Sequence, residues 1–331
     1  MTLYLFYVII GKCDILIILS YILIFFKNAI YGMTVFFTGS LTKSTDVLDI
    51  LALRFLLSFV VFEILKRTKI LKINIGFKDY YGKTERSKYF KSLFFCALFE
   101  PVLYMLFETL GISMLSGIMT GVLLSLAPIF NISFASIFLH EKTSVLEKLL
   151  IFIGIIGVGY VAICSGNTEG ENSILGMLFI ILALVSSSFY IVFSRKSSKQ
   201  FTSMEITYFA SFLGMIVFNT VNIIRHLICG DILNYFEPYF DFENMIGFLF
   251  LSVVATIIAV GISNFTVSRI KIATVAAFGG VSTFVTIAAG VFLGGEKLQT
   301  FHIIGITLIT IRMIGVCYLT YEKNKLENLN K

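Results

Sequence analysis

Ten apolar runs, each about as long as a lipid bilayer is thick, dominate this sequence. They cover approximately residues 15–40, 47–65, 90–110, 115–139, 147–165, 174–194, 203–224, 245–267, 272–294 and 301–320. A helix needs roughly 20 apolar residues to cross the ~30 Å hydrocarbon core of a membrane. Only 14% of the residues are charged, against about 25% in soluble domains. The sequence therefore predicts an all-α integral membrane protein with ten transmembrane helices.

Lysine and arginine are distributed unequally over the two sides of this predicted layout. With the N-terminus inside, 20 of them fall on the cytoplasmic side, nine of these in the loop 66–91, and three fall outside. Cytoplasmic loops of membrane proteins carry an excess of positive charge, so we expect a multi-pass plasma-membrane protein with both termini in the cytoplasm. The net charge of +6 does not indicate a nucleic-acid partner, because the basic residues sit in short loops between the spans.

A local pattern recurs at an offset of 155 residues. Residues 125–142 (SLAPIFNISFASIFLHEK) and 280–297 (GVSTFVTIAAGVFLGGEK) both end in Glu-Lys, and one more apolar run follows each. Because five spans separate the copies, the two halves are expected to face opposite ways, as the inverted repeats of secondary transporters do. The predicted organisation is a cytoplasmic N-terminal segment 1–14, a first five-helix repeat 15–165, an external linker 166–173, a second five-helix repeat 174–321 and a cytoplasmic tail 322–331.

Several short motifs, in their order and spacing, resemble the EamA-type branch of the drug/metabolite transporter superfamily over about residues 20–320. Tyr31-Gly32 stands where that family has Trp-Gly in its first helix, and Leu53-Arg54-Phe55 matches a motif of its second helix. Pro128 and Glu141-Lys142 match its fourth helix, and Glu296-Lys297 followed by Gly305 repeats that ending. Tyr31 and Thr283 depart from the usual Trp and Pro. The resemblance implies a cavity between helices 1, 3, 4, 6, 8 and 9 that opens alternately to each side, and a cargo that is a small metabolite, amino acid or drug.

Glu100 is the leading candidate for a functional side chain. It lies about ten residues, roughly 15 Å, from either end of the third predicted helix, which is too far for a carboxylate to reach water. Ionisable groups at membrane depth are costly and usually functional. Pro101 removes a backbone donor beside it and can kink the helix, and Tyr104 lies one turn away on the same face. Glu100 is predicted to bind an amine or a coupling proton, and the alternative is a structural, protonated or ion-paired glutamate.

Lys27, Asn28 and Tyr31 are grouped in the first helix. Two positions for Lys27 remain open: it forms an ion pair with Glu100, or the helix starts near residue 20 and the lysine snorkels to the cytoplasmic face. Asn28 and Tyr31 are predicted to offer uncharged contacts to a substrate.

The remaining polar residues divide into candidates and structural residues. Asn131 and Asn264 are predicted either to line the cavity or to form hydrogen bonds between helices, and Ser186, Ser187 and Ser188 to pack helices. Arg54 and Arg312 are expected to snorkel or to have a structural role rather than to contact substrate, and Glu141 and Glu296 to cap or clamp helix ends. Glu63, Glu108 and His302 lie near the predicted interfaces, where charge is inexpensive, and are assigned no role.

The function that these features favour is secondary active transport of a small organic solute by alternating access, with export as the expected direction. Protons are the candidate coupling ion, and no cofactor or metal is indicated, because the sequence has no phosphate-binding loop and no clustered His and Cys ligands. An intramembrane enzyme is disfavoured, since neither H-E-x-x-H nor G-x-S-x-G occurs. The alternative is a membrane-embedded sensor or scaffold. A monomer or a weak homodimer is expected.

Overall fold

The computed structural model describes residues 12–75, 85–139, 145–165, 173–259, 262 and 279–329. All regular structure in these ranges is helical. The first half of the chain forms α2 (Lys12–Leu41), α3 (Val47–Arg67), η1 (Arg86–Tyr89), α5 (Phe90–Ala97), η2 (Leu98–Leu103), α6 (Tyr104–Ile112), α7 (Gly117–Leu124), α8 (Ala127–Leu139) and α9 (Val145–Ser165). The second half forms α10 (Ile174–Ser197), α11 (Ser203–Cys229), η3 (Ile232–Asn234), η4 (Glu237–Tyr239), α12 (Phe242–Leu249), η5 (Phe250–Ile258), α15 (Gly279–Phe292) and α16 (Thr300–Leu329).

Four helices in the described ranges are long and apolar enough to cross a membrane, and a fifth candidate is a bent pair. The four are Leu19–Leu41, Arg86–Ile112, Ile174–Ser197 and Ser203–Cys229, and the pair is Ile232–Tyr239 with Phe242–Ile258. Helix α3 carries five charged side chains, which lower its hydropathy: Asp49, Arg54, Glu63, Lys66 and Arg67. The chain is thus an all-helical membrane protein, and the layout of ten spans stays a prediction.

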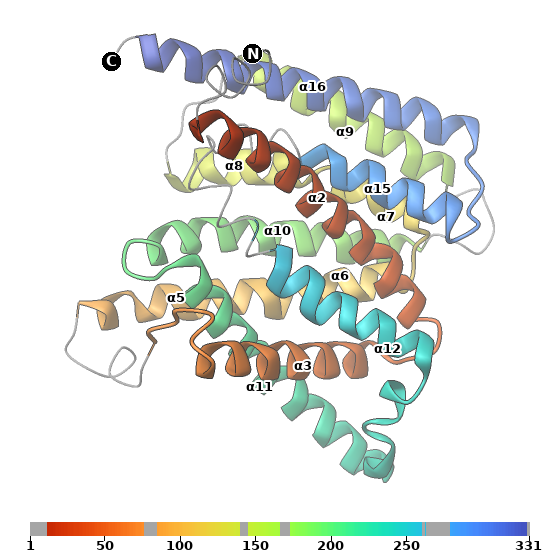
Figure 1. The fold of residues 1–331 in the computed structure, drawn as a ribbon. Coiled ribbons are helices and arrows are strands. Elements are labelled where there is room, and N and C mark those ends of the chain that lie inside the picture. Colours follow the sequence, from red (N-terminus) through yellow and green to blue (C-terminus); the bar gives the residue numbers. More distant parts are fainter. Residues whose placement is uncertain are drawn as a thin grey trace, which may run out of the picture.

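The helices run side by side, with several of their ends gathered at one end of the bundle (Figure 1). The start of α2 and the ends of α3, α10 and α16 lie together there, on the left of the view. Lys66 and Arg67 close α3, and Arg195 and Lys196 lie in the last turn of α10. We call this the basic end and the other the opposite end. The basic residues that end α3 and α10 thus lie toward the same end of the bundle.

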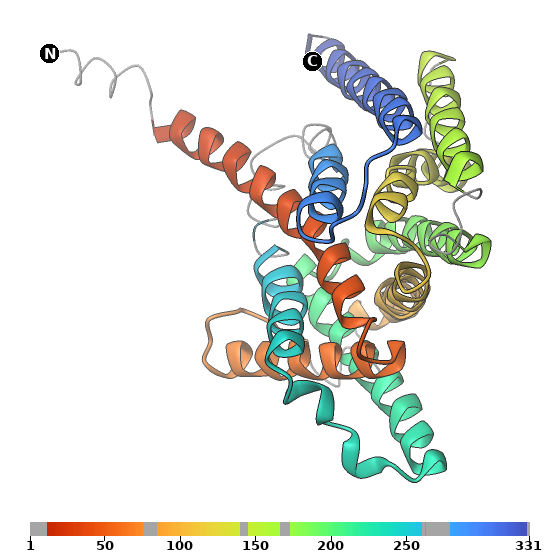
Figure 2. The same ribbon diagram turned by 90° about the vertical axis from the view of Figure 1, so that its right-hand side faces the viewer.

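Small residues allow pairs of helices to pack closely. Helices α2 and α15 cross at Gly32, where an added Cβ would lie 2.5 Å from the Ser282 carbonyl oxygen, and the Thr286 hydroxyl donates to the Gly32 carbonyl at 2.9 Å. Helices α9 and α16 form a pair at the edge of the bundle (Figures 1 and 2). There a Cβ on Gly305 would overlap Val161. Close approach of helices at small residues is the usual packing device in membranes.

Large apolar side chains cover much of the outer surface. Ile163, Ile174, Ile228 and Phe292 are each at least 76% exposed. A water-soluble protein of this size rarely exposes such extensive apolar surface. Lipid is therefore the solvent for these faces.

Candidate functional site

A cavity of about 460 Å³ lies inside the bundle. Its volume is in the range typical of pockets for small organic ligands. The polar and charged side chains that line it come from α2, α3, η2, α6, α10, α11, η5 and α15: Tyr31, Thr34, Arg54, Glu100, Tyr104, Glu108, Ser187, Tyr190, Ser194, Ser203, Thr207, Ser211, Thr256, Ser282, Thr283 and Thr286. Within the described ranges, no three His, Cys, Asp or Glu residues are grouped so that they could hold a metal ion.

The wall that carries Glu100 is a break in a helix. Glu100 has extended backbone angles, φ −143° and ψ 116°, inside the π-helical turn η2, and Pro101 follows it. Pro101 has no N–H and its ring clashes with the preceding turn, so a regular α-helix cannot continue through it. Irregular backbone at membrane depth is tolerated where it lines a cavity. The kink predicted at Pro101 is confirmed, and it places the Glu100 carboxylate on the cavity wall.

Glu100 begins a polar ridge along η2 and α6. Tyr104 and Glu108 follow at intervals of four residues and line the same cavity, and the Tyr104 hydroxyl donates to Glu108 Oε1 at 2.6 Å. Residues four apart share a helix face. This spacing is the sequence signal for Glu108, for which no role was expected because it lies close to the predicted helix end.

Arg54 also lies on the cavity wall, although a structural role was expected for it. The residue is only 4% exposed, its Nε has no hydrogen-bond partner, and no ion pair of its guanidinium occurs within the described ranges. Three other side chains hold the backbone around it. The Asn219 amide, the Tyr239 hydroxyl and the Ser252 hydroxyl donate to the carbonyls of residues 52, 53 and 54, at 3.0, 2.6 and 3.0 Å. These bonds fix α3 to α11, η4 and η5.

The three candidates in helix α2 separate in the structure. Tyr31 lines the cavity, whereas Lys27 and Asn28 are not among its described lining residues. Lys27 and Glu100 do not form an ion pair; the Lys27 ammonium lies 5.0 Å from the centroid of the Tyr31 ring instead. Asn28 donates to the Ile24 carbonyl one turn earlier. The predicted Lys27–Glu100 pair is thus absent here, and substrate contacts of Lys27 and Asn28 stay predictions.

Of the two candidate asparagines, Asn131 and Asn264, only Asn131 lies in the described part of the chain. Asn131 accepts a hydrogen bond from the Ser188 hydroxyl at 3.0 Å and so joins α8 to α10, which is the structural alternative considered for it. Asn264 lies outside the described residues. Thr286, which corresponds to Asn131 at the 155-residue offset, lines the cavity.

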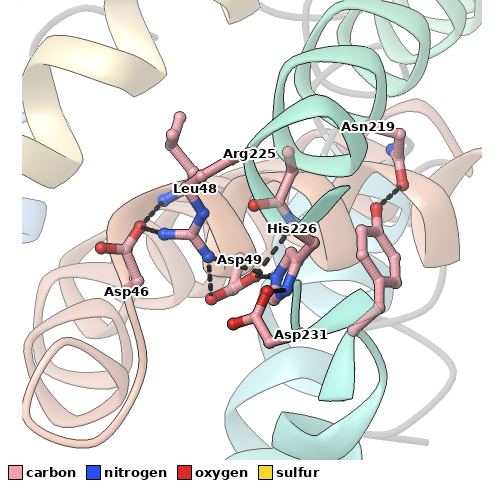
Figure 3. A network of polar contacts seen from close by, with 9 residues as sticks. Asp46, Leu48, Asp49, Asn219, Arg225, His226 and Asp231 are labelled. Atoms are coloured by element: carbon pink, nitrogen blue, oxygen red, sulfur yellow. Dashed lines mark hydrogen bonds and ion pairs between the residues drawn. The ribbon is translucent and has the colours of Figure 1, made fainter. Parts of the chain in front are cut away.

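A second polar group, the His226 cluster, lies where α3 begins and α11 ends (Figure 3). It comprises Asp46, Asp49, Arg225, His226 and Asp231. His226 Nε2 lies 2.8 Å from Asp49 and Nδ1 2.9 Å from Asp231, while Arg225 forms ion pairs of 2.6 Å with both Asp46 and Asp49. A carboxylate faces each ring nitrogen, and both nitrogens can donate only when the imidazole is protonated. The cluster ties α3 to α11 at the opposite end of the bundle.

Glu296 caps a helix from the other half of the chain. Its carboxylate accepts from the Gly117 and Ile118 amides at the start of α7, at 2.5 and 2.8 Å. The first amides of a helix lack partners within the helix and favour a negative charge. The predicted capping role of Glu296 is confirmed, and Glu141, its counterpart, lies outside the described residues.

A helical membrane protein with a polar cavity at a broken helix belongs to the general class of solute transporters. Comparison of sequences narrows this class. The profile of the EamA-like transporter family matches the chain twice, at residues 18–163 and 174–318. The protein therefore belongs to the EamA-like transporter family.

Individual relatives agree with this assignment. The chain is 28% identical over 296 residues to the uncharacterized transporter YcxC of Bacillus subtilis (strain 168), which covers 89% of this chain and 92% of that protein. It is 26% identical over 135 residues, 41% of this chain and 47% of the relative, to an uncharacterized transporter of Archaeoglobus fulgidus. One crystal structure shares the fold with a TM-score of 0.57 at 14% identity, over 91% of this chain and 97% of that one.

Proposed function

We propose that the protein is a secondary active transporter that moves a small organic solute across the cytoplasmic membrane by alternating access, with export as the expected direction. The observation that carries the proposal is the convergence of Arg54, Glu100 and Glu108 on one cavity at a break in a helix. Buried charge without a full set of partners is costly to maintain. A solute or coupling ion that occupies the cavity explains why the charges are kept.

The two halves support a mechanism with two pseudo-symmetric states. The family profile matches each half separately. At an offset of 155 residues, the broken segment η2 corresponds to residues 253–258, which lie within the second π-helical segment, η5. Glu100 then corresponds to Ala255, and both line the cavity. Irregular helical segments in corresponding positions of the two halves are expected of a transporter built from inverted repeats, so we assign the repeats to residues 15–165 and 174–321.

The conformation described here is assigned to the state that opens toward the cytoplasm. The cavity lining reaches Ser203, the first residue of α11, at the basic end. At the opposite end, the Glu296 cap and the His226 cluster join elements of the two halves. The positive-inside rule places the basic end in the cytoplasm, which gives the cavity a cytoplasmic entrance and a closed outer side.

A sensor or scaffold is the second function considered. That function would be favoured if Glu100 faced lipid or a dry packed interface. Glu100 instead lies on the wall of a cavity of about 460 Å³, which favours transport.

The experiment is solute uptake into proteoliposomes that contain the purified protein, with an imposed proton gradient in one arm. A panel of radiolabelled amino acids, nucleosides, sugars and polyamines serves as the set of probes. We expect saturable uptake of at least one probe by the wild type and its loss in Glu100→Gln. Glu237→Gln is the matched control, because Glu237 is exposed and lies outside the cavity lining.

Two results would count against the proposal. Uptake of no probe above that of empty liposomes would remove the transport function. Full uptake by Glu100→Gln would leave transport in place but show that Glu100 neither binds the solute nor couples its movement.

A further inference from the structure

We propose that the connection between α11 and α12, residues 230–241, docks on the membrane surface and inserts Leu233, Phe236 and Phe240 at the level of the lipid headgroups. We call it the 230–241 segment. It contains the short turns η3 and η4 and lies beside the His226 cluster, at the opposite end of the bundle. This contact with lipid is independent of the transport function proposed above.

The inner side of the 230–241 segment is bound to the helices. The Tyr235 hydroxyl donates to the Asn219 side chain of α11 at 2.5 Å, and the Tyr239 hydroxyl donates to a backbone carbonyl of α3 at 2.6 Å. The Tyr239 ring also packs edge-on against Phe248 of α12, with 4.9 Å between the ring centroids. The segment is thus held against three helices on one side, which leaves its other side for a partner outside the chain.

The outer side of the segment carries large apolar side chains. Leu233 is 95% exposed and Phe240 86% exposed, and Phe236 and Phe242 are exposed as well. Apolar surface in water is unfavourable, and groups of exposed apolar side chains usually mark a contact with a membrane or with another protein. A partner that is itself apolar is therefore expected on this side.

The flanking helices identify that partner as lipid. Leu227 and Ile228, in the last turns of α11, are 61% and 80% exposed, and Ile246 and Leu249 of α12 are exposed too. Helix α11 is one of the helices that are long and apolar enough to cross a membrane. Its end and the turns that follow project past α3 at the lower edge of the bundle (Figure 1). The segment joins two lipid-facing surfaces, so its apolar side chains meet the same lipid.

The backbone of the segment determines how deep it lies. The turns η3 and η4 are 3₁₀ turns of three residues each, at Ile232–Asn234 and Glu237–Tyr239. Irregular backbone that faces lipid is not tolerated in the hydrocarbon core, because its N–H and C=O groups find no water there. The segment therefore lies at the membrane–water interface, where apolar side chains reach about 5–10 Å into the boundary between headgroups and acyl chains.

The charges of the segment indicate that apolar contact, and not attraction to anionic lipid, holds it there. Glu237 and Asp241 are exposed, and the sequence has no Lys or Arg between residues 226 and 268. Interfacial helices that bind anionic lipid carry Lys and Arg on their polar face. The carboxylates instead keep the polar edge of the segment in water.

The chain contains no tryptophan, so a single introduced tryptophan reports on its own surroundings. Phe240→Trp and, separately, Phe242→Trp are reconstituted in phosphatidylcholine liposomes. Fluorescence quenching is measured with phosphatidylcholine brominated either near the headgroup end of its acyl chains or near their terminal methyl groups, and with acrylamide equilibrated on both sides of the membrane. Lys43→Trp, at an exposed polar position outside the segment, is the control.

The emission of Phe240→Trp should be blue-shifted relative to that of Lys43→Trp. Lipid brominated near the headgroup should quench it at least about twofold more strongly than lipid brominated near the chain end. Acrylamide should quench it less than it quenches Lys43→Trp, and addition of phosphatidylglycerol to the liposomes should leave the quenching by brominated lipid unchanged.

Four results would overturn the proposal. Quenching by acrylamide equal to that of Lys43→Trp, without quenching by brominated lipid, would show that water covers the segment. Blue-shifted emission that neither quencher reduces would show that a protein surface, such as a second copy of the chain, covers it. Stronger quenching by the deeply brominated lipid would contradict the interfacial depth, and a gain on adding phosphatidylglycerol would assign the contact to charge. Phe242→Trp supplies the same readout if Phe240→Trp does not fold.

Discussion

The crossing of α2 and α15 makes a quantitative prediction about Gly32. A Cβ added at this position would lie 2.5 Å from the Ser282 carbonyl oxygen and 2.6 Å from Val285 Cβ. Both distances are well below van der Waals contact, and one of the two atoms belongs to the backbone, so the helices must separate. Overpacking of this kind costs about 1–3 kcal/mol. Separation also weakens the hydrogen bond from Thr286 to the Gly32 carbonyl, which is worth about 0.6 kcal/mol in a membrane.

An opposing effect reduces the expected loss. Alanine is a better helix former than glycine by about 1 kcal/mol. Gly32→Ala should therefore lower the free energy of unfolding by a net ~0.5–2.5 kcal/mol. Gly159→Ala is the matched control, because no atom lies within 4 Å of its added Cβ, and it should be neutral or stabilising.

The assay is reversible unfolding of the purified protein in mixed micelles, followed by helical circular dichroism. Substrate exchange by the same samples shows whether the α2–α15 crossing also matters for transport. If Gly32→Ala is as stable as Gly159→Ala, the close approach of the two helices at this point is wrong.

Three further changes test other parts of the structure. Glu296→Gln removes the negative charge at the start of α7 and should lower the free energy of unfolding by about 0.5–2 kcal/mol in the same assay, whereas Glu237→Gln should not; equal stabilities of the two variants would contradict the cap. In His226→Gln the side chain can no longer donate to both Asp49 and Asp231. The substitution should lower the free energy of unfolding by about 1–2 kcal/mol at pH 5.5, a range already reduced because Asp231 is partly exposed to solvent. Because both contacts require the protonated imidazole, the wild type should lose stability between pH 5.5 and 8, and an equal loss in His226→Gln would show that this residue is not responsible. Ser188→Ala removes the hydroxyl that donates to Asn131 and should lower the free energy of unfolding by about 0.6 kcal/mol. The melting temperature of this variant should therefore lie slightly below that of Ser187→Ala, measured in parallel.

Much of the fold follows from local signals that act over short distances. The Glu100-Pro101 pair predicted a break because proline lacks the backbone donor, and the structure has extended backbone at Glu100. The repeated Glu-Lys ending predicted that Glu296 would cap a helix, and it accepts from the first amides of α7. Each of these outcomes depends on the chemistry of one or two residues.

The residues that line the cavity were harder to predict, because the depth of each side chain in the membrane was judged from its distance to the ends of its helix. By that measure Glu108 lay near an interface, where charge is inexpensive, and Arg54 was not expected to contact substrate, yet both line the cavity. A charged side chain that faces a water-filled cavity is tolerated at depths in the membrane where a charged side chain facing lipid would not be. The spacing of Glu100, Tyr104 and Glu108 contained the missing information, whereas no neighbouring residue in the sequence revealed that Arg54 lines the cavity.

The ion pair of Lys27 with Glu100, one of the two positions left open for this lysine, is absent for a different reason. Equal depth in two neighbouring helices does not determine which way each side chain points. In the structure the Lys27 ammonium lies over the ring of Tyr31, four residues away on its own helix. Rotation of a helix about its axis depends on packing with all its neighbours, such as the Gly32 crossing with α15.

Alternating access is tested most directly by counterflow in proteoliposomes. Liposomes containing the wild type are loaded with an unlabelled solute that the protein takes up in the uptake assay, and the same solute, radiolabelled, is added outside at low concentration. A carrier that exposes one site to each side in turn predicts transient accumulation of label above the external concentration, and its absence in Glu100→Gln. Label that only equilibrates in the wild type, at a rate independent of the internal solute, would contradict the account.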